Sequence, residues 1–179
     1  MGTVGIICEF NPLHSGHAYL MAQLRQKGAE AIVCAMSGNF VQRGEPALVH
    51  KLARAEMAVD CGADLVLELP TPWAMATAET FAMGGVQLLH MAGCSHIAFG
   101  SECGDAALLQ KTADILLLPQ FQADILAELA SGVTYAAARQ RAAERYQSHS
   151  AAVLSRPNDT LAVEYLKACR RLGVDMTPM

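Results

Sequence analysis

Short apolar runs alternate with longer amphipathic segments through the first part of this chain. The runs are TVGIIC at 3–8, AIVCAM at 31–36, LVLEL at 65–69 and HIAF at 96–99. A run that is apolar almost throughout, instead of at every second position, is typical of a strand buried on both faces of a parallel sheet. The sequence therefore predicts an α/β fold, a doubly wound parallel sheet with helices on both faces.

The predicted helices lie between these strands and end at glycine or proline signals. Pro46 is expected in the first turn of the second helix. Between 105 and 147 the pattern is helical, with breaks near Pro119 and at 131–132. Residues 174–179 begin a fifth strand. The remaining helical segments are 16–27, 47–61, 78–91 and 158–172.

Composition places the chain among ordinary globular proteins. Of its 179 residues, 53% are hydrophobic and 17% are charged, a balance that suits one domain with a buried core and excludes a disordered chain. The net charge of −4 argues against a dedicated nucleic-acid-binding surface. Six cysteines without a C-x-x-C pair, and no visible leader or membrane span, predict a cytoplasmic protein without a membrane partner.

Polar residues directly follow the first predicted strand, in the segment EFNPLHSGH at 9–17. Ligands of doubly wound sheets bind beyond the carboxyl ends of the strands, so this segment falls at the ligand edge. The helix that begins near Ser15 and Gly16 presents unpaired N–H groups and a positive dipole end, which suit a phosphate. His14 and His17 are three residues apart, so both imidazoles lie on one side of that turn and can donate to phosphate oxygens.

Other interpretations of the histidine pair remain open on the residues alone. An ordinary strand-to-helix turn can carry surface histidines, and Glu9 together with His14 and His17 offers three ligands for a metal ion. The position of the pair at the ligand edge favours a nucleotide or phosphate site over these two alternatives.

Several motifs resemble a known family. The segment HSGH at 14–17 is similar to the H-x-G-H signature of the nucleotidyltransferase superfamily. GIICEFNPLHSGH, MSGNFVQRGEPA, ADLVLELPTPWA leading into AETFAMGGV, FGSE and NDTLAVEYLKA, in that order, resemble the bacterial tRNA(Met) cytidine acetate ligase family over nearly the whole chain. The resemblance implies a Rossmann-like, nucleotidyltransferase-type sheet with a helical insertion after the fourth strand, and no metal site in the protein itself.

The resemblance also implies an activity. Members of that family activate acetate with ATP, expected here with Mg²⁺, and form acetyl-adenylate. They then transfer the acetyl group to N4 of the wobble cytidine of elongator tRNA(Met). The alternatives are another nucleotidyltransferase that adenylylates a small-molecule phosphate, and a non-catalytic fragment that binds a nucleotide or a metal.

Site residues follow from the same resemblance. His14 and His17 are expected to be catalytic and to contact the phosphates of ATP. Gly100, directly after the fourth strand, would let a base or ribose approach the backbone. Asn158 matches an ATP contact and could also cap a helix, since its carbonyl and amide groups can serve different partners. The full set of implied ATP contacts is Ile7, Cys8, Glu9, Phe10, Asn11, Pro12, Leu13, His14, Ser15, Gly16, His17, Gly100 and Asn158.

The loop 37–46 follows the second strand and also opens at the ligand edge. Its candidates for substrate contacts are Ser37, Asn39, Gln42 and Arg43. An arginine there can hold a carboxylate or phosphate through two parallel hydrogen bonds. Glu68 and Glu79 are further acidic candidates, although Glu79 also suits the dipole at a helix start.

The chain departs from the resembled family in length. Family members are longer and carry a second phosphate-binding signature, with Ser, Lys or Arg, after the fifth strand. Residues 1–179 are therefore expected to be an ATP-binding domain truncated at its C-terminal end, with the main tRNA-binding region outside it. An open sheet edge at that end also predicts self-association into a homo-oligomer.

Overall fold

A computed structural model describes residues 2–42 and 44–179 of the chain. One parallel sheet has the strand order β3-β2-β1-β4-β5. The strand order reverses between β1 and β4, which makes the carboxyl end of β1 the expected ligand position. The predicted α/β parallel sheet is confirmed. Its strands are β1 (Thr3–Cys8), β2 (Ala31–Ser37), β3 (Leu65–Leu69), β4 (His96–Ala98) and β5 (Thr177–Pro178).

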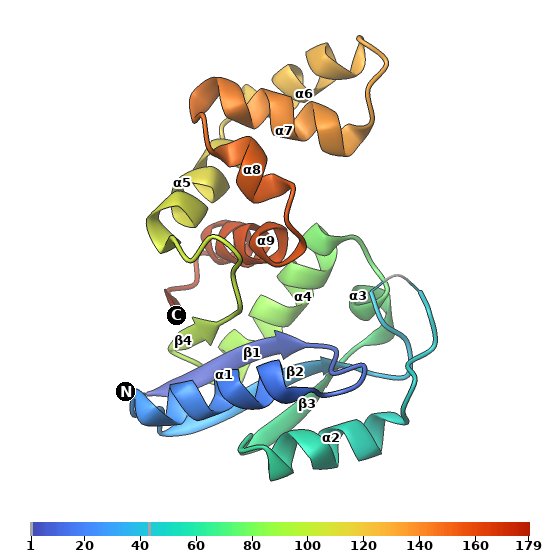
Figure 1. The fold of residues 1–179 in the computed structure, drawn as a ribbon, viewed down its shortest axis with the longest axis vertical. Helices are drawn as coiled ribbons and strands as arrows, with labels where there is room; N and C mark the ends of the chain where they lie inside the picture. The colour runs from blue at the N-terminus through green and yellow to red at the C-terminus, as the bar shows by residue number, and fades with distance from the viewer. Residues whose placement is uncertain (1, 43) are drawn as a thin grey trace. The chain divides into compact units, whose positions relative to one another are not determined.

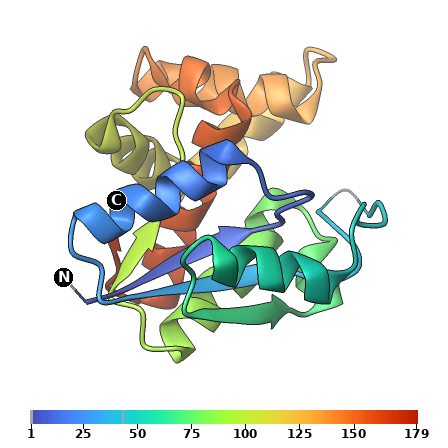
Figure 2. The same ribbon diagram turned by 60° about the horizontal axis from the view of Figure 1, so that its bottom comes forward.

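Different helices cover the two faces of this sheet, as Figures 1 and 2 show. Helices α1 (Ser15–Gln26) and α2 (Lys51–Asp60) lie over one face, and α4 (Ala78–Met91) lies over the other. The apolar runs are needed because each strand of the sheet centre faces a helix on both sides.

Alternate residues of β1 meet the two helical layers. The even-numbered residues of β1 and β2 form one core cluster with α1 and α2. On the opposite face, α4 approaches β1 closely at two glycines. A Cβ added to Gly5 would lie 2.6 Å from Leu89 Cδ1, and a Cβ added to Gly85 would lie 2.6 Å from Ile7 Cδ1. The cluster on the α1 and α2 side contains Val4, Ile6, Cys8, Met21, Leu24, Ile32, Cys34, Met36 and Ala58.

The second helix begins later than its sequence predicts. It starts at Lys51, with His50 as its N-cap, and Pro46 instead forms an isolated bridge with Phe40. The prediction that Pro46 begins the helix is wrong because 47–48 have other partners. Their backbone N–H groups donate to the Asn39 carbonyl oxygen at 2.9 Å and to Asn11 Oδ1 at 2.7 Å.

Two compact units make up the described chain. One comprises the residues up to Phe99 together with Ala168–Met179, and the other comprises Gly100–Lys167. The second unit is helical, and its breaks near Pro119 and at 131–132 fall where the sequence predicts them, whereas the short helix Ser150–Leu154 is not predicted. Its helices are α5 (Ala106–Leu116), α6 (Phe121–Leu129), α7 (Tyr135–Tyr146), α8 (Ser150–Leu154) and most of α9 (Pro157–Leu172). The short α3 (Thr71–Ala74) in the first unit is not predicted from the sequence.

Within the described part of the chain, no helix combines the length and the apolar character needed to cross a membrane.

Candidate functional site

Phe10 anchors the turn after β1 in the hydrophobic core. Its side chain is 2% exposed and belongs to the core cluster, although its backbone adopts a φ of 46°, a conformation that non-glycine residues rarely take. The ring of Phe10 meets the ring of His17 edge-on, with 4.9 Å between centroids. Strain of this kind persists only where the surroundings hold it, and here the buried ring does so. The turn therefore has a fixed shape.

His14 and His17 form a reciprocal cap at the start of α1. The Gly16 amide donates to His14 Nδ1 at 3.1 Å, and the His14 amide donates to His17 Nδ1 at 3.3 Å. The two rings are stacked, with 3.7 Å between centroids and an interplanar angle of 26°. Histidine thus performs the task that a Ser and a Glu share in the common capping box.

This cap decides which ring nitrogen carries the proton. An Nδ1 that accepts a hydrogen bond is unprotonated, so the hydrogen of each neutral imidazole lies on Nε2. Burial, and then the neighbouring His14 ring, lower the pKa of His17 below its ordinary value. Both effects favour the neutral form. His14 and His17 consequently offer two Nε2–H donors at the positive end of the α1 dipole, a combination suited to phosphate oxygens.

The other implied ATP contacts around this turn differ in exposure. The side chains of Ile7 and Cys8 lie in the core, and burial, followed by a hydrogen bond with Cys34, raises the pKa of the Cys8 thiol well above its ordinary value. A ligand can therefore meet these two residues only through their backbone. Leu13 packs against the core cluster. Pro12, Ser15 and Gly16 are exposed.

Glu9 and Asn11 fasten the loop that follows β2. Glu9 Oε1 accepts a hydrogen bond from the Gln42 amide at 2.6 Å, and Asn11 Oδ1 accepts one from the Leu48 amide at 2.7 Å. The structure therefore brings the two predicted polar segments, 9–17 and 37–46, together at the ends of neighbouring strands. In the residues that the structure describes, no three His, Cys, Asp or Glu side chains gather as a metal site.

Arg54 joins the same two segments from beneath and was not identified from the sequence. Its side chain is fully buried, and its guanidinium donates to the carbonyl oxygens of Glu9 and Gly38, and to that of Val49 at 3.0 Å. Burial lowers its pKa. A single arginine on a helix carries no sequence signal for this role, because its partners are backbone atoms of distant loops.

The four substrate-loop candidates are placed differently. Ser37 ends β2 and is fully buried, and its Oγ has no hydrogen-bond partner among the described residues. Asn39 is exposed and Gln42 is half-buried. Arg43 lies outside the described residues. Ser37 is thus the buried last residue of β2, whereas the sequence analysis placed it in the loop 37–46.

The two acidic candidates, exposed Glu68 and half-buried Glu79, are each paired with a cation. Glu68 lies on β3 and binds Lys51 Nζ through both carboxylate oxygens, at 2.9 and 2.7 Å. Glu79 forms an ion pair with Arg171. The sequence did not identify Lys51 as the partner of Glu68, because the two residues lie 17 positions apart on different elements.

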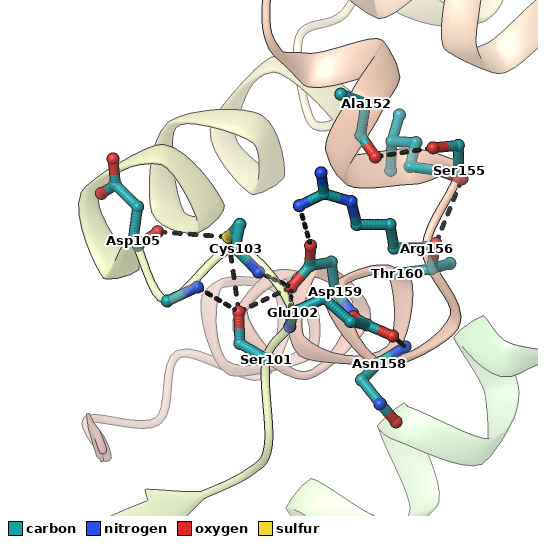
Figure 3. A network of polar contacts seen from close by, with 12 residues as sticks. Ser101, Glu102, Cys103, Asp105, Ala152, Ser155, Arg156, Asn158, Asp159 and Thr160 are labelled. Carbon is teal, nitrogen blue, oxygen red and sulfur yellow. Dashed lines mark hydrogen bonds and ion pairs between the residues drawn. The ribbon is translucent and has the colours of Figure 1, made fainter.

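Gly100 and Asn158 belong to the second unit, and Figure 3 shows the contacts around Asn158. A Cβ at Gly100 would meet no atom within 4 Å, so packing does not require this glycine. Asn158 is the second residue of α9, which makes the expected N-cap role wrong. The backbone N–H of Asn158 donates to Glu102 Oε1 at 3.1 Å, while the exposed side chain of Asn158 points away from that carboxylate.

Comparison with known families gives a match over the whole chain. A family model described as HIGH Nucleotidyl Transferase matches residues 1–179. The tRNA(Met) cytidine acetate ligases of Acetivibrio thermocellus and Syntrophotalea carbinolica are each 45% identical to this chain. The two matches cover 100% and 99% of this chain, but only 45% and 44% of those relatives.

Solved structures agree with the sequence relatives. Thermotoga maritima TmcAL bound with alpha-thio ATP superposes with a TM-score of 0.93 at 37% identity, covering 99% of this chain and 45% of that one. Its apo form gives a TM-score of 0.92 at the same identity, covering 99% of this chain and 44% of the other. The present chain thus spans less than half the length of the relatives it matches.

Proposed function

This chain belongs to the HIGH Nucleotidyl Transferase family, and from that premise we propose that it forms the ATP-binding part of a tRNA(Met) cytidine acetate ligase. The observation that carries the proposal is the reciprocal cap of His14 and His17, which occupies both Nδ1 atoms and leaves the two Nε2–H groups as donors. An ATP analogue bound to the Thermotoga maritima structure supports ATP as the nucleotide.

The proposed reaction has two steps. A carboxylate oxygen of acetate attacks the α-phosphorus of ATP, the bond from that phosphorus to the bridging oxygen breaks, and pyrophosphate leaves. The N4 amine of the wobble cytidine then attacks the carbonyl carbon of acetyl-adenylate, and AMP leaves. The tRNA is the acceptor named for the relatives, and a cytoplasmic location belongs to the same proposal.

In the first step, His14 and His17 act on the growing negative charge. Hydrogen bonds from the two Nε2–H groups to phosphate oxygens strengthen as charge moves onto the departing pyrophosphate. The positive end of the α1 dipole adds to this stabilisation. Mg²⁺ would accompany the triphosphate, held mainly by phosphate oxygens and water, as is usual for this ion.

The remaining candidates have assigned places in the proposal. The segment 7–17 contacts ATP, through backbone atoms where its side chains are buried. Gly100 and Asn158 contact the nucleoside. Ser37, Asn39, Gln42 and Arg43 remain candidates for substrate contacts in the loop after β2.

Calorimetry with ATP tests the histidine role. Loss of one charge-assisted hydrogen bond of about 1.5–3 kcal/mol predicts that His17→Ala weakens ATP binding by roughly ten- to a hundredfold. His50→Ala is the matched control, because His50 also caps a helix, accepting from the Leu52 amide at 3.3 Å, but follows no strand end. Equal ATP affinities for His17→Ala and the wild type would exclude His17 from the site.

ATP–pyrophosphate exchange tests the acid. Exchange that depends on acetate is expected if this chain completes the first step. If exchange appears only with another acid or a small-molecule phosphate, that compound and not acetate is the substrate. The same assay on a longer chain, of the length of the relatives, tests whether these residues suffice.

A further inference from the structure

Two carboxylates connect the loop after β4 with the start of α9, because each accepts hydrogen bonds from backbone amides of the other segment (Figure 3). Glu102 accepts from the Asn158 amide with Oε1 at 3.1 Å and from the Asp159 amide with Oε2 at 2.8 Å. Asp159 Oδ1 in return accepts from Ser101 Oγ at 2.6 Å and from the Glu102 and Cys103 amides at 2.9 and 3.2 Å. We call Ser101, Glu102 and Asp159 the carboxylate clamp.

The carboxylate clamp is charged and rigid. Asp159 is fully buried, and burial alone would raise its pKa, yet the hydrogen bonds from Ser101 and from the Cys103 and Glu102 amides lower the pKa below the ordinary value. The Gly104 amide also donates to Ser101 Oγ at 3.0 Å, which closes the loop on itself. Because five of these six donors to the clamp are backbone N–H groups, the contacts fix the main chain itself.

The residues beside the carboxylate clamp are left free. Gly100 immediately precedes Ser101, and nothing lies within 4 Å of where its side chain would be. Asn158 immediately precedes Asp159, and within the described chain its side-chain amide makes no hydrogen bond. An open glycine and a free amide are thus presented from two segments that the clamp ties together.

The charge of the carboxylate clamp favours an uncharged ligand group. Arg156 Nη1 lies 3.7 Å from Asp159 Oδ2 and offsets one of the two carboxylates, which leaves the other. A net negative charge repels phosphate. The amide of Asn158 offers both a donor and an acceptor, which match the hydroxyls of a ribose or the edge of a base.

We propose that Glu102 and Asp159 are positioning residues that hold Gly100 and Asn158 in register for the nucleoside half of ATP. This inference rests on the proposed function, since it assigns the partner of residues already placed in the ATP site. The clamp does not touch the nucleotide. It acts by fixing the two segments that do.

Comparison of ATP with inorganic tripolyphosphate tests this role by calorimetry, because tripolyphosphate lacks the nucleoside. We expect Glu102→Ala to weaken ATP binding by about tenfold, a partial transmission of two lost charge-assisted hydrogen bonds, and to leave tripolyphosphate binding unchanged. Glu102→Gln keeps one acceptor oxygen and is expected to lie between Glu102→Ala and the wild type. His17→Ala, in contrast, weakens both ligands.

Controls separate positioning from loss of structure. Glu102 is exposed, so Glu102→Ala is expected to retain the circular dichroism spectrum of the wild type. Thr134→Ala removes a cap of α7 in the same unit, where Thr134 accepts from the Ala137 amide at 3.3 Å, and is expected to leave both affinities unchanged. Equal losses for ATP and tripolyphosphate in Glu102→Ala, or no loss of ATP, would overturn the inference and leave the proposed function standing. A wild type that binds tripolyphosphate but not ATP would overturn both.

Discussion

Replacing Arg54 by lysine tests whether one buried guanidinium ties the loops of the candidate site together. Arg54 is fully buried on α2 and donates to the carbonyl oxygens of Glu9, Gly38 and Val49. These carbonyls follow β1, follow β2 and precede α2. The Arg54→Lys variant keeps the positive charge, so its effect isolates the geometry of the planar fork.

The expected loss follows from the number of carbonyls left without a donor. An ammonium group on a lysine stem is a compact donor and reaches about one of the three carbonyls in place of the fork. Each abandoned buried acceptor costs about 1–3 kcal/mol, and partial entry of water reduces that cost. We therefore expect Arg54→Lys to lower the free energy of unfolding by about 2–4 kcal/mol, a large share of the roughly 5–15 kcal/mol typical of a domain.

Urea unfolding followed by tryptophan fluorescence measures this loss. Trp73 is the one tryptophan of the sequence and lies in the same compact unit as Arg54, so its emission follows the relevant unit. Arg25→Lys is the matched control. Arg25 also donates to several backbone carbonyls, but its side chain is 35% exposed and water can replace it, so a loss below about 1 kcal/mol is expected. If Arg54→Lys lowers the free energy of unfolding by less than about 0.5 kcal/mol, Arg54 does not hold the two loops together. Equal losses for Arg54→Lys and Arg25→Lys would lead to the same conclusion.

Three further predictions concern pH and packing. NMR titration should give His17 a pKa below the ordinary histidine value. The unfolded chain then binds the proton more readily than the folded chain, so the free energy of unfolding falls as the pH drops below about 6.5. A measured pKa at or above that value would contradict the burial argument. The hydrogen bond from the Ile32 amide lowers the pKa of Asp64, so the stabilisation by this carboxylate is present above pH ~4 and is lost as the pH falls through the lower folded pKa. Asp64→Asn should therefore reduce the dependence of the free energy of unfolding on pH in the acid range. An unchanged dependence would contradict this assignment. Gly84→Ala should cost about 1–3 kcal/mol and shift the emission of Trp73, whose Cδ1 lies 2.2 Å from the added Cβ, whereas an unchanged spectrum would show that the ring moves freely.

The apolar runs predicted the strands correctly because a run of neighbouring apolar residues indicates a buried segment. Residues 3–8 form a strand with the expected bounds, since a strand covered on both faces must be apolar at nearly every position. Residues 65–69 also form a strand with the expected bounds, although β3 lies at the edge of the sheet and only its last residue, Leu69, is buried. The breaks of the helical region near Pro119 and at 131–132 also fall where the backbone chemistry of proline and glycine requires them.

Errors arose where distant partners override a local signal. Pro46 suits a helix start, but hydrogen bonds from the following residues to Asn39 and Asn11 hold the chain outside the helix, which begins only at Lys51. Asn158 suits a helix cap, but α9 begins one residue earlier and the Glu102 carboxylate serves its first amides. Local preference is weak compared with tertiary hydrogen bonds of this kind.

The sequence by itself determined the parallel sheet and the place of His14 and His17, because periodicity and position after a strand are properties of neighbouring residues. Only the tertiary structure decided that each histidine holds its proton on Nε2, that Arg54 joins two loops, and that Glu102 and Asp159 serve each other across 57 residues of chain. Such pairs leave no pattern in the sequence. Each carboxylate or guanidinium there binds backbone atoms, which every residue possesses, so the choice of partner is made by how the chain folds.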